Sequence, residues 1–284
     1  MSILDNKNRI GNFTSSENHR LMGLGKRPMT AAELASRPKS GVGSSVKTIE
    51  DPSILNDAAF EYIEEKNMER RLGRSLSTET NARPLTWGHV CERQAFETLG
   101  TDYKLCSDVT LDHPEIAFWR GSPDALKFDE GGTVGEIKCP MTMKSFCQLV
   151  DPLYHGFSGT EAMNAIRNGW KDKSGLNHKP HKDAEKYYWQ IVSNAILSGS
   201  KYGELIVYCP YESELEALRE IVNNWDGNQN PLAWINFSEN SELPYLLDDG
   251  FYKNLNIIRF EIPIEDRILM KVKIEMAGKM LITC

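Results

Sequence analysis

A glycine-rich turn between two short apolar segments most constrains what this chain can fold into. The segment G-S-P-D-A-L, which contains Asp124, and the segment V-G-E-I-K-C-P flank the turn D-E-G-G. This pattern predicts a β-hairpin whose second strand carries Glu136, Ile137 and Lys138. Because successive side chains of a strand point to opposite faces, Glu136 and Lys138 share one face while Ile137 enters the core. We expect Asp124, at the start of the hairpin, to meet them at the sheet edge.

Two carboxylates and an ammonium group at one sheet edge suit the binding of Mg²⁺ against a phosphodiester. Mg²⁺ prefers oxygen ligands and retains several waters, so Asp124, Glu136 and the Ile137 carbonyl would suffice as protein ligands. Phosphodiester hydrolysis needs an activated water and neutralised phosphate charge, and divalent ions supply both. Lys138 would position or deprotonate the water, or stabilise the developing charge, and a nearby dication should favour its neutral amine. We therefore expect Mg²⁺ as cofactor, with Mn²⁺ able to replace it.

Two predicted helices can add polar groups to this edge. The helix that Pro84 opens carries Glu92, and a helix over 182–198 carries Gln190 within an otherwise apolar face. Taken singly, Glu92 is most simply a solvated helix residue and Gln190 a polar residue on a half-buried helix. The aspartate–glutamate–lysine pattern alone is also common as surface charge. The ordered combination is much harder to attribute to chance.

Composition bounds the class of protein. The chain has 284 residues, of which 40% are hydrophobic, so it can build a substantial core. No apolar run reaches the length of about 18 residues that a membrane helix needs, and the first residues lack a signal-peptide pattern. The six cysteines lack C-x-x-C spacing, which favours reduced thiols in a cytoplasmic protein over a disulfide framework or a zinc site.

Charge is distributed unevenly along the chain. The formal net charge is −7, yet residues 1–49 carry eight Lys/Arg against three Asp/Glu, while residues 203–266 carry three against thirteen. One face of such a protein can repel DNA while another receives it. We interpret the acidic part as a solvated surface.

The order of predicted elements favours one α/β domain with a mixed central β-sheet flanked by helices on both faces. We predict a basic N-terminal segment over 1–52, which forms part of a DNA-end pocket, and a single domain over 53–284. Its core spans about 80–210, and an acidic extension spans 211–284. Residues 24–52 are predicted to form a mobile loop with one helical turn, and Thr14 or Ser15 to cap a short helix. The remaining predicted helices span 53–72, 84–99, 141–150, 159–168, 182–198 and 211–224, with one more after Pro263; the predicted strands span 103–111, 116–120, 124–128, 133–138, 202–209 and 256–262, with a short one near Trp234.

The ordered blocks W-G…E, S-P-D and E-I-K-C-P, followed by Gln190, resemble the PD-(D/E)xK nuclease superfamily. Within it, residues 9–210 resemble the phage lambda exonuclease / YqaJ-type viral recombinase family. The segment R-I-G-N-F-T-S-S-E, which starts at Arg9, is similar to the family's R-L-G-x-x-T-A-S-E. The segment N-A-R-P-L-T-W-G is similar to its N-A-K-A-L-A-W-G. The resemblance implies a restriction-endonuclease-like core.

Carried over residue by residue, the resemblance implies roles for eleven positions. Asp124, Glu136 and the Ile137 carbonyl bind metal. Glu92 acts at the site, with a second metal as one option, while Lys138 and Gln190 assist the water. Arg9, Ser16 and Ser122 form a pocket for the 5′-phosphate of the degraded strand. Leu85 is an apolar wedge that parts terminal base pairs, and Arg83 lies beside it on the DNA path. The competing interpretations are a mobile tail cation for Arg9 and an ordinary core leucine for Leu85.

The resemblance also implies an activity and partners. We expect a Mg²⁺-dependent exodeoxyribonuclease that degrades one strand of double-stranded DNA from the 5′ end and leaves 3′ tails for phage-type recombination. The expected partners are duplex DNA ends, further copies of the chain in a homotrimeric ring, and a single-strand annealing recombinase, in a bacterial or phage-infected host cytoplasm. A ring would reconcile the net charge with DNA binding, since only the lumen need be basic.

Two departures from the family pattern stand out. Ala125 replaces the glycine that usually follows the metal-binding aspartate, and the segment 150–186 is longer than in the phage enzyme. This segment is rich in lysine and is interpreted either as a DNA-contacting loop or as solvated charge. Two other functions stay open. One is a different nuclease of this fold, such as an endonuclease or an iron–sulfur repair nuclease, although the scattered cysteines disfavour a cluster. The other is a non-catalytic DNA-end-binding protein.

Overall fold

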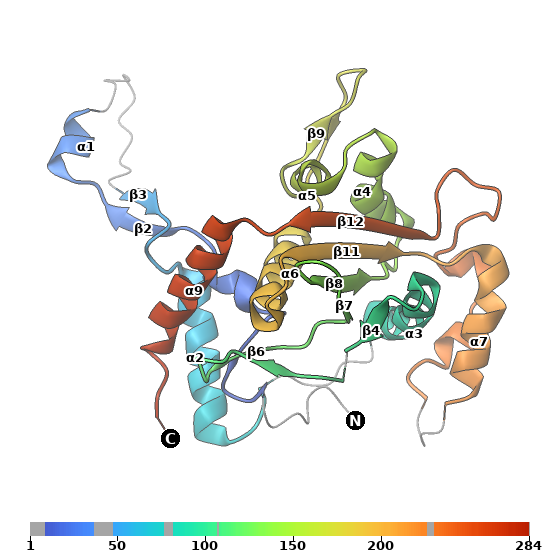
Figure 1. Ribbon diagram of the computed structural model, residues 1–284, viewed down its shortest axis with the longest axis horizontal. Coiled ribbons are helices and arrows are strands. Elements are labelled where there is room, and N and C mark those ends of the chain that lie inside the picture. Colours follow the sequence, from blue (N-terminus) through green and yellow to red (C-terminus); the bar gives the residue numbers. More distant parts are fainter. Residues whose placement is uncertain (1–8, 37–47, 77–81, 107, 226–229, 284) are drawn as a thin grey trace.

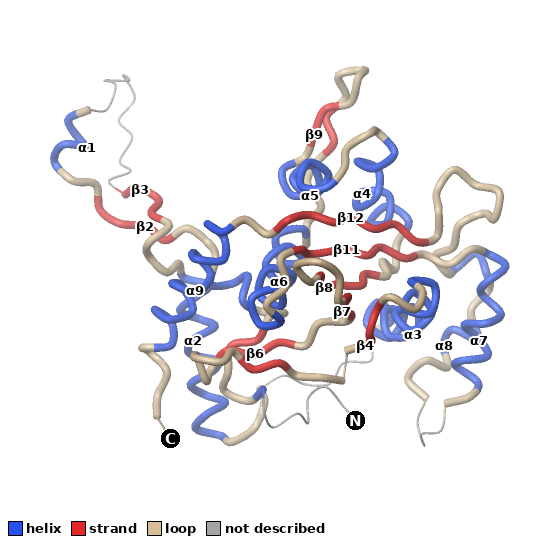
Figure 2. The backbone as a smooth tube through the Cα atoms, viewed as in Figure 1, coloured by secondary structure: helices blue, strands red, loops and turns tan. Residues whose placement is uncertain are grey.

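A five-stranded mixed sheet organises the computed structural model, which describes residues 9–36, 48–76, 82–106, 108–225 and 230–283. Its central strand β8 pairs in parallel with β11 and antiparallel with β7, and the edge strands β12 and β4 are also antiparallel to their neighbours. The strands lie in the order β12 (Leu255–Glu261), β11 (Tyr202–Tyr208), β8 (Thr133–Lys138), β7 (Ala125–Lys127) and β4 (Tyr103–Leu105). The predicted mixed sheet with flanking helices is confirmed (Figures 1 and 2).

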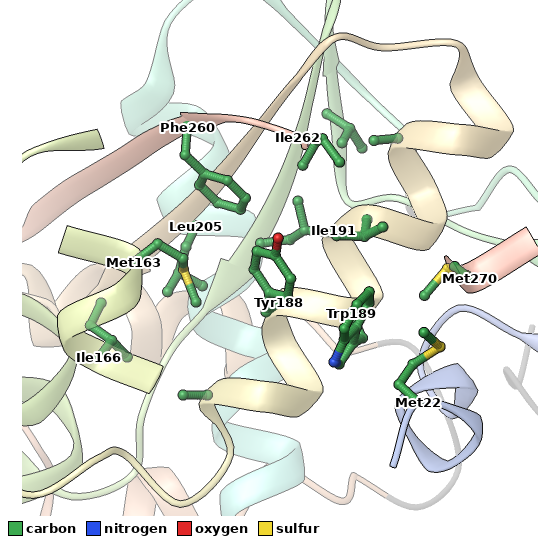
Figure 3. Close-up of a cluster of buried hydrophobic side chains, with 14 of the residues drawn as sticks. Met22, Met163, Ile166, Tyr188, Trp189, Ile191, Leu205, Phe260, Ile262 and Met270 are labelled. Atoms are coloured by element: carbon green, nitrogen blue, oxygen red, sulfur yellow. The ribbon is translucent and has the colours of Figure 1, made fainter. Parts of the chain in front are cut away.

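Alternate residues of the strands enter two separate cores, as the period of two requires. Leu205 and Val207 of β11 belong to the larger core, whereas Ile206 and Tyr208 belong to the smaller one. The larger core lies against α2 (Asp57–Leu72), α4 (Met143–Tyr154), α5 (Gly159–Asn168), α6 (Ala184–Ser198) and α9 (Ile264–Gly278). Figure 3 shows its centre, where Tyr188 and Ile191 of α6 meet the sheet. The smaller core lies against α3 (Arg83–Leu99), α7 (Leu215–Asn223) and α8 (Trp234–Phe237).

A second, smaller sheet fastens the N-terminal segment to the body. Strand β1 (Phe13–Thr14) pairs in parallel with β6 (Trp119–Gly121), which in turn pairs antiparallel with β5 (Leu111–Asp112). The backbone N–H of Thr14 also donates to the Tyr62 hydroxyl of α2 at 3.0 Å. The 3₁₀ helix η3 (Asn18–Leu21) follows, with Glu17 rather than Thr14 or Ser15 at its N-cap. The predicted cap is wrong because Thr14 is engaged in β1.

Residues 25–36 and 48–51 form an arm that projects beside α9 (Figure 1). Strands β2 (Gly25–Pro28) and β3 (Thr48–Asp51) pair antiparallel, and α1 (Ala31–Ala35) lies between them in the chain. Arg27 donates to both Asp51 and Glu33, which holds the three elements together. The predicted helical turn is confirmed by α1, whereas the predicted loop is replaced by paired strands over 25–28 and 48–51; residues 37–47 lie outside the described residues.

Local signals placed several other elements correctly or nearly so. Helix α2 ends at Gly73, whose φ of 65° is left-handed as expected for a helix stop, but Asn56 rather than Ser53 caps its start. The segment near Trp234 is helical instead of a strand, since the Trp234 indole donates to Thr86 Oγ1 and packs in the smaller core. The strand predicted over 103–111 is confined to β4 and the start of β5. Two 3₁₀ turns complete the C-terminal part, η4 (Glu212–Glu214) and η5 (Asn240–Glu242).

Within the described ranges, no helix combines the length and apolar character needed to cross a membrane. The five described cysteines, Cys91, Cys106, Cys139, Cys147 and Cys209, are free thiols. The division of the chain at residues 52 and 53 stays a prediction.

Candidate active site

The hairpin of β7 and β8 brings Asp124 beside the strand that carries the glutamate and the lysine. Ala125 pairs with Gly135, so Asp124 enters the hairpin opposite the centre of β8. Its Oδ2 accepts the backbone N–H of Ile137 at 2.7 Å. The turn depends on Gly131 and Gly132, whose φ angles of 84° and 70° suit glycine. The predicted hairpin is confirmed, and it fixes Asp124 against the backbone of β8.

Glu136 is the hub of the site. Its carboxylate is 1% exposed and accepts a hydrogen bond from Lys138 Nζ at 2.5 Å and another from Gln190 Nε2. Asn194 Nδ2 lies 3.5 Å from the other carboxylate oxygen. Gln190 and Asn194 are four residues apart on α6, so both project from one face of that helix. Sequence reasoning identified Gln190 and missed Asn194, although the i, i+4 spacing was a usable signal.

Glu92 reaches the same cluster from the opposite face of the sheet. Helix α3 is fixed by Val90 and Cys91, which pack with Ile137 in the smaller core. The next residue, Glu92, is thereby held half-buried near the hairpin. Burial, reinforced by the negative charge of Asp124, raises the pKa of Glu92 to about 7. The charges of Asp124 and Lys138 both act on Glu92, and a joint catalytic role of the three residues stays a prediction.

The charges in the site do not balance. Burial raises the pKa of Glu136 to about 8, and the nearby Asp124 adds to the effect. Burial also raises the pKa of Asp124. For Lys138, burial alone would lower the pKa, but Glu136 and Asp124 outweigh it and raise the pKa. The lysine is therefore a cation here, and the neutral amine expected from the sequence would require a bound dication.

Three carboxyl groups facing one ammonium group fit a divalent cation, because added positive charge would relieve their mutual repulsion. Among the described residues, no group of three or more His, Cys, Asp or Glu side chains is placed to hold a metal ion by side chains alone. A bound Mg²⁺ would therefore take Asp124, Glu136 and the main-chain carbonyl of Ile137, with water in its other positions. The donor chemistry of the site suits this ion, and these three ligands stay a prediction.

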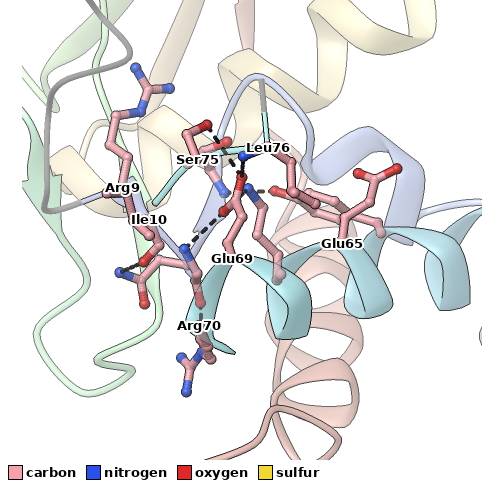
Figure 4. Close-up of polar contacts among 12 residues, drawn as sticks. Arg9, Ile10, Glu65, Glu69, Arg70, Ser75 and Leu76 are labelled. Carbon is pink, nitrogen blue, oxygen red and sulfur yellow. Dashed lines mark hydrogen bonds and ion pairs between the residues drawn. The ribbon is translucent and has the colours of Figure 1, made fainter. Parts of the chain in front are cut away.

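The segment that carries Arg9 is held in place. The backbone N–H of Gly11 donates to Glu69 at 2.9 Å, and Arg70 Nε donates to the Gly11 carbonyl at 2.8 Å. Figure 4 shows the Arg9 side chain pointing away from this cluster. Arg9 Nη2 lies 3.5 Å from Ser16 Oγ, and burial lowers its pKa. The interpretation of Arg9 as a mobile tail cation is therefore wrong.

Ser122, the third residue of the predicted phosphate pocket, is brought toward Arg9 and Ser16 by the smaller sheet. The backbone N–H of Ser15 donates to the Arg120 carbonyl at 3.0 Å, which places Ser16 near the end of β6. Ser122 follows β6 directly and is hydrogen-bonded to Thr110 at 3.2 Å between the two hydroxyl oxygens. Because only Pro123 separates Ser122 from Asp124, the pocket residues and the acidic cluster adjoin one another.

A buried polar layer, absent from the sequence-based prediction, lies between the pocket and the acidic cluster. Ser193 Oγ lies 2.8 Å from Ser15 Oγ and accepts the Trp119 indole N–H at 2.9 Å. A Cβ at Gly121 would stand 2.0 Å from Ser15 Oγ and 2.4 Å from Asn194 Oδ1. Only glycine therefore allows β6 to approach α6 this closely. Asn194 of α6 then contacts both β6 and Glu136.

Leu85 and Arg83 lie on the surface at the start of α3. Leu85 is 48% exposed, so its interpretation as a core leucine is wrong. The Arg83 guanidinium lies over the Trp234 ring, 5.0 Å from its centroid. Both side chains are accessible to a ligand, and their contact with DNA stays a prediction.

Comparisons with known proteins agree at the level of the fold. No protein-family model matches the sequence, and no curated protein sequence matches it. Among solved structures, a phage-related exonuclease from Haemophilus somnus 129PT aligns with a TM-score of 0.51 at 14% identity, over 95% of this chain and 92% of that one. The alkaline exonuclease LHK-Exo from Laribacter hongkongensis, solved in complex with dAMP, aligns with a TM-score of 0.50 at 14% identity, over 96% and 90%. The chain shares the fold of these exonucleases along nearly its whole length.

The raised pKa of Glu136 predicts a pH dependence of stability. A carboxyl whose folded-state pKa is about 8 contributes stability that is fully present below its ordinary pKa of 4.5 and is lost as pH rises through about 8. In EDTA, the urea midpoint of the wild type should therefore fall between pH 5 and pH 8, and Glu136→Gln should flatten that fall. Glu265→Gln, an exposed site on α9, is the control. An equally steep fall in Glu136→Gln would contradict the assignment.

Proposed function

We propose that the chain is a Mg²⁺-dependent exodeoxyribonuclease of the PD-(D/E)xK superfamily, similar to the lambda exonuclease / YqaJ-type family. The observation that carries this proposal is the meeting of Asp124, Glu136 and Lys138 at the β7–β8 hairpin in the middle of the sheet, with Lys138 Nζ 2.5 Å from Glu136. The resemblance to two solved exonucleases in fold supports it, as do the positions of Glu92 and Gln190. A non-catalytic DNA-end binder would have no need of this buried, charge-imbalanced cluster.

Each residue of the cluster has a distinct task in this proposal. When bound, Mg²⁺ neutralises charge on the phosphate and lowers the pKa of a coordinated water. Asp124 and Glu136 hold the site's negative charge in fixed positions. Asp124 accepts a hydrogen bond from the β8 backbone, and Glu136 accepts hydrogen bonds from three side-chain donors. Lys138, whose side chain is 21% exposed, orients the attacking water and offsets charge that develops on the phosphate. Gln190 fixes the Glu136 carboxylate.

The direction of degradation follows from the phosphate pocket. Arg9, Ser16 and Ser122 bind a terminal 5′-phosphate, since guanidinium and hydroxyl groups are suitable donors to it. Leu85 enters the base stack and parts the terminal pairs, while Arg83 contacts the strand beside it. The enzyme then removes nucleotides from the 5′-terminated strand of duplex DNA and leaves a 3′ single-stranded tail for recombination.

The assembly and partners are proposed on the resemblance and the charge distribution. Three copies form a ring around the duplex, with basic groups toward the lumen and the exposed acidic residues of 211–225 and 239–266 outside. A single-strand annealing recombinase receives the 3′ tail. The setting is the cytoplasm of a bacterial or phage-infected cell.

Lys138→Ala should abolish hydrolysis of linear duplex DNA in Mg²⁺, because the ammonium that orients the water is lost. We expect a decrease in rate of at least about 10²–10³-fold, the usual cost of losing one charge-stabilising donor. Release of acid-soluble nucleotide from a uniformly labelled duplex measures it. Lys253→Ala, at an exposed lysine, should retain wild-type activity.

Folding of Lys138→Ala is checked by circular dichroism. Full activity in a folded Lys138→Ala protein would contradict the proposal. Nicking of covalently closed circular DNA by the wild type would instead favour an endonuclease of this fold. No hydrolysis by the wild type with either Mg²⁺ or Mn²⁺ would favour a DNA-end-binding protein.

Arg9→Ala should reduce the preference for a 5′-phosphate. Wild-type protein should release a label at the 5′ end before one at the 3′ end, and should act faster on a 5′-phosphate than on a 5′-hydroxyl duplex. A hydrogen bond to a charged group contributes about 1.5–3 kcal/mol, so the variant should lose roughly tenfold or more of that preference. Arg71→Ala, at an exposed arginine of α2, is the control. Earlier release of the 3′ label would contradict the proposed polarity.

A further inference from the structure

A narrow hairpin projects from the body beyond α5. Strands β9 (Trp170–Lys171) and β10 (Asn177–His178) pair antiparallel, and residues 169–180 together form what we call the basic finger. Figure 1 shows it standing clear of the helices and the central sheet. Segments that extend this far from a core without burying apolar surface commonly serve to contact a partner.

The basic finger is built to hold one shape. At its tip, Asp172 Oδ1 accepts the backbone N–H groups of Ser174 and Leu176, each at 2.9 Å. At its base, the rings of Trp170 and His178 stack with centroids 3.8 Å apart and planes 4° apart. The His155 ring, from the end of α4, lies 4.6 Å from the Trp170 ring. A preorganised hairpin of this kind loses little conformational freedom when a ligand binds.

Its positive charge is not neutralised within the described part of the chain. Lys171, Lys173 and Lys179 are exposed, and no ion pair to any of them occurs there. The single acidic residue of the finger, Asp172, accepts hydrogen bonds inside the turn. By contrast, cations that flank the finger are paired, as Arg167 is with Glu185 at 2.8 Å. The three lysines are therefore available to an anionic partner.

The base of the finger is close to the candidate active site. His181, just beyond the finger, lies 2.7 Å from Ser145 Oγ through its Nε2, and its ring stacks near Tyr187 with centroids 5.8 Å apart. Lys138 Nζ lies 5.1 Å from the centroid of the Tyr187 ring. Two side chains therefore separate the finger's base from the candidate catalytic lysine. A polyanion whose end occupied that site would pass within reach of the finger.

We propose that the basic finger binds the sugar–phosphate backbone of the duplex that extends away from the cleaved end. This proposal rests on the proposed function, because it takes duplex DNA as the ligand of the neighbouring site. Exposed lysines on a rigid strand pair act as point charges toward phosphates and carry no base specificity. The finger thereby increases the affinity for duplex DNA of any sequence.

The test is the salt dependence of DNA binding in a variant that combines Lys171→Ala, Lys173→Ala and Lys179→Ala. Fluorescence anisotropy with a blunt duplex in EDTA, from about 50 to about 200 mM salt, measures the slope of log Kd against log salt. Each lost phosphate contact lowers that slope by about 0.9, so loss of all three should lower it by about 2.7. A variant with Lys253→Ala, Lys271→Ala and Lys279→Ala removes equal charge elsewhere and should keep the wild-type slope.

A single-stranded oligonucleotide of equal length identifies the bound form of DNA. A decrease in slope for the duplex, larger than for the single strand, supports the proposal. An unchanged duplex slope, an equal decrease in the control variant, or a decrease confined to the single strand would overturn it. Equal urea midpoints for the two variants exclude misfolding.

Turnover separates this proposal from the proposed function. The finger variant should retain the maximal rate at saturating duplex and require more DNA to reach half of it. If the wild-type protein binds duplex but never cleaves it, and the slope is still lowered in the variant, the proposed nuclease activity is contradicted and DNA binding by the basic finger is supported. If cleavage is normal and the slope is unchanged in the variant, DNA binding by the basic finger is overturned and the proposed nuclease activity is supported.

Discussion

The buried carboxylate of Glu136 is the interaction on which the site depends. A carboxyl group that is 1% exposed is costly to ionise unless its oxygens have partners. Here Lys138 lies in the same strand, while Gln190 and Asn194 come from α6, which packs on that face of the sheet. The pairing of β8 with β11 and the packing of α6 therefore position the functional groups. Burial of Glu136 and Asp124 beside a single lysine raises the pKa values of both carboxyl groups, so the cluster favours an added cation.

A second constraint connects the N-terminal segment to this hub. The short parallel pair of β1 and β6 places Ser15 against α6, and Gly121 leaves room for that approach. Asn194 contacts the same glycine and lies 3.5 Å from Glu136 through its amide nitrogen. The predicted phosphate pocket and the predicted metal ligands are consequently parts of one packed unit. A displacement of β6 would disturb both.

Sequence patterns sufficed where the physical cause was local. The period of two placed Glu136 and Lys138 on one face, and Gly73 marked the end of α2 through its left-handed backbone. The patterns failed where contacts with residues distant in the sequence determine the local structure or the hydrogen-bond partners. Asn194 and Ser193 acquire their partners through contacts with residues more than 50 positions away, and the arm formed by β2, α1 and β3 is held by the hydrogen bonds of Arg27. Trp234 is helical because it packs on α3, which no local propensity reveals.

The central claim is that Asp124 and Glu136 hold a divalent cation beside Lys138. Anomalous diffraction from crystals of the whole chain, grown with Mn²⁺, tests it most directly because manganese scatters anomalously and can replace Mg²⁺. The account predicts an anomalous peak in contact with carboxylate oxygens of both acidic residues, next to the Ile137 carbonyl. Manganese bound only elsewhere, at a concentration that supports cleavage, would contradict it.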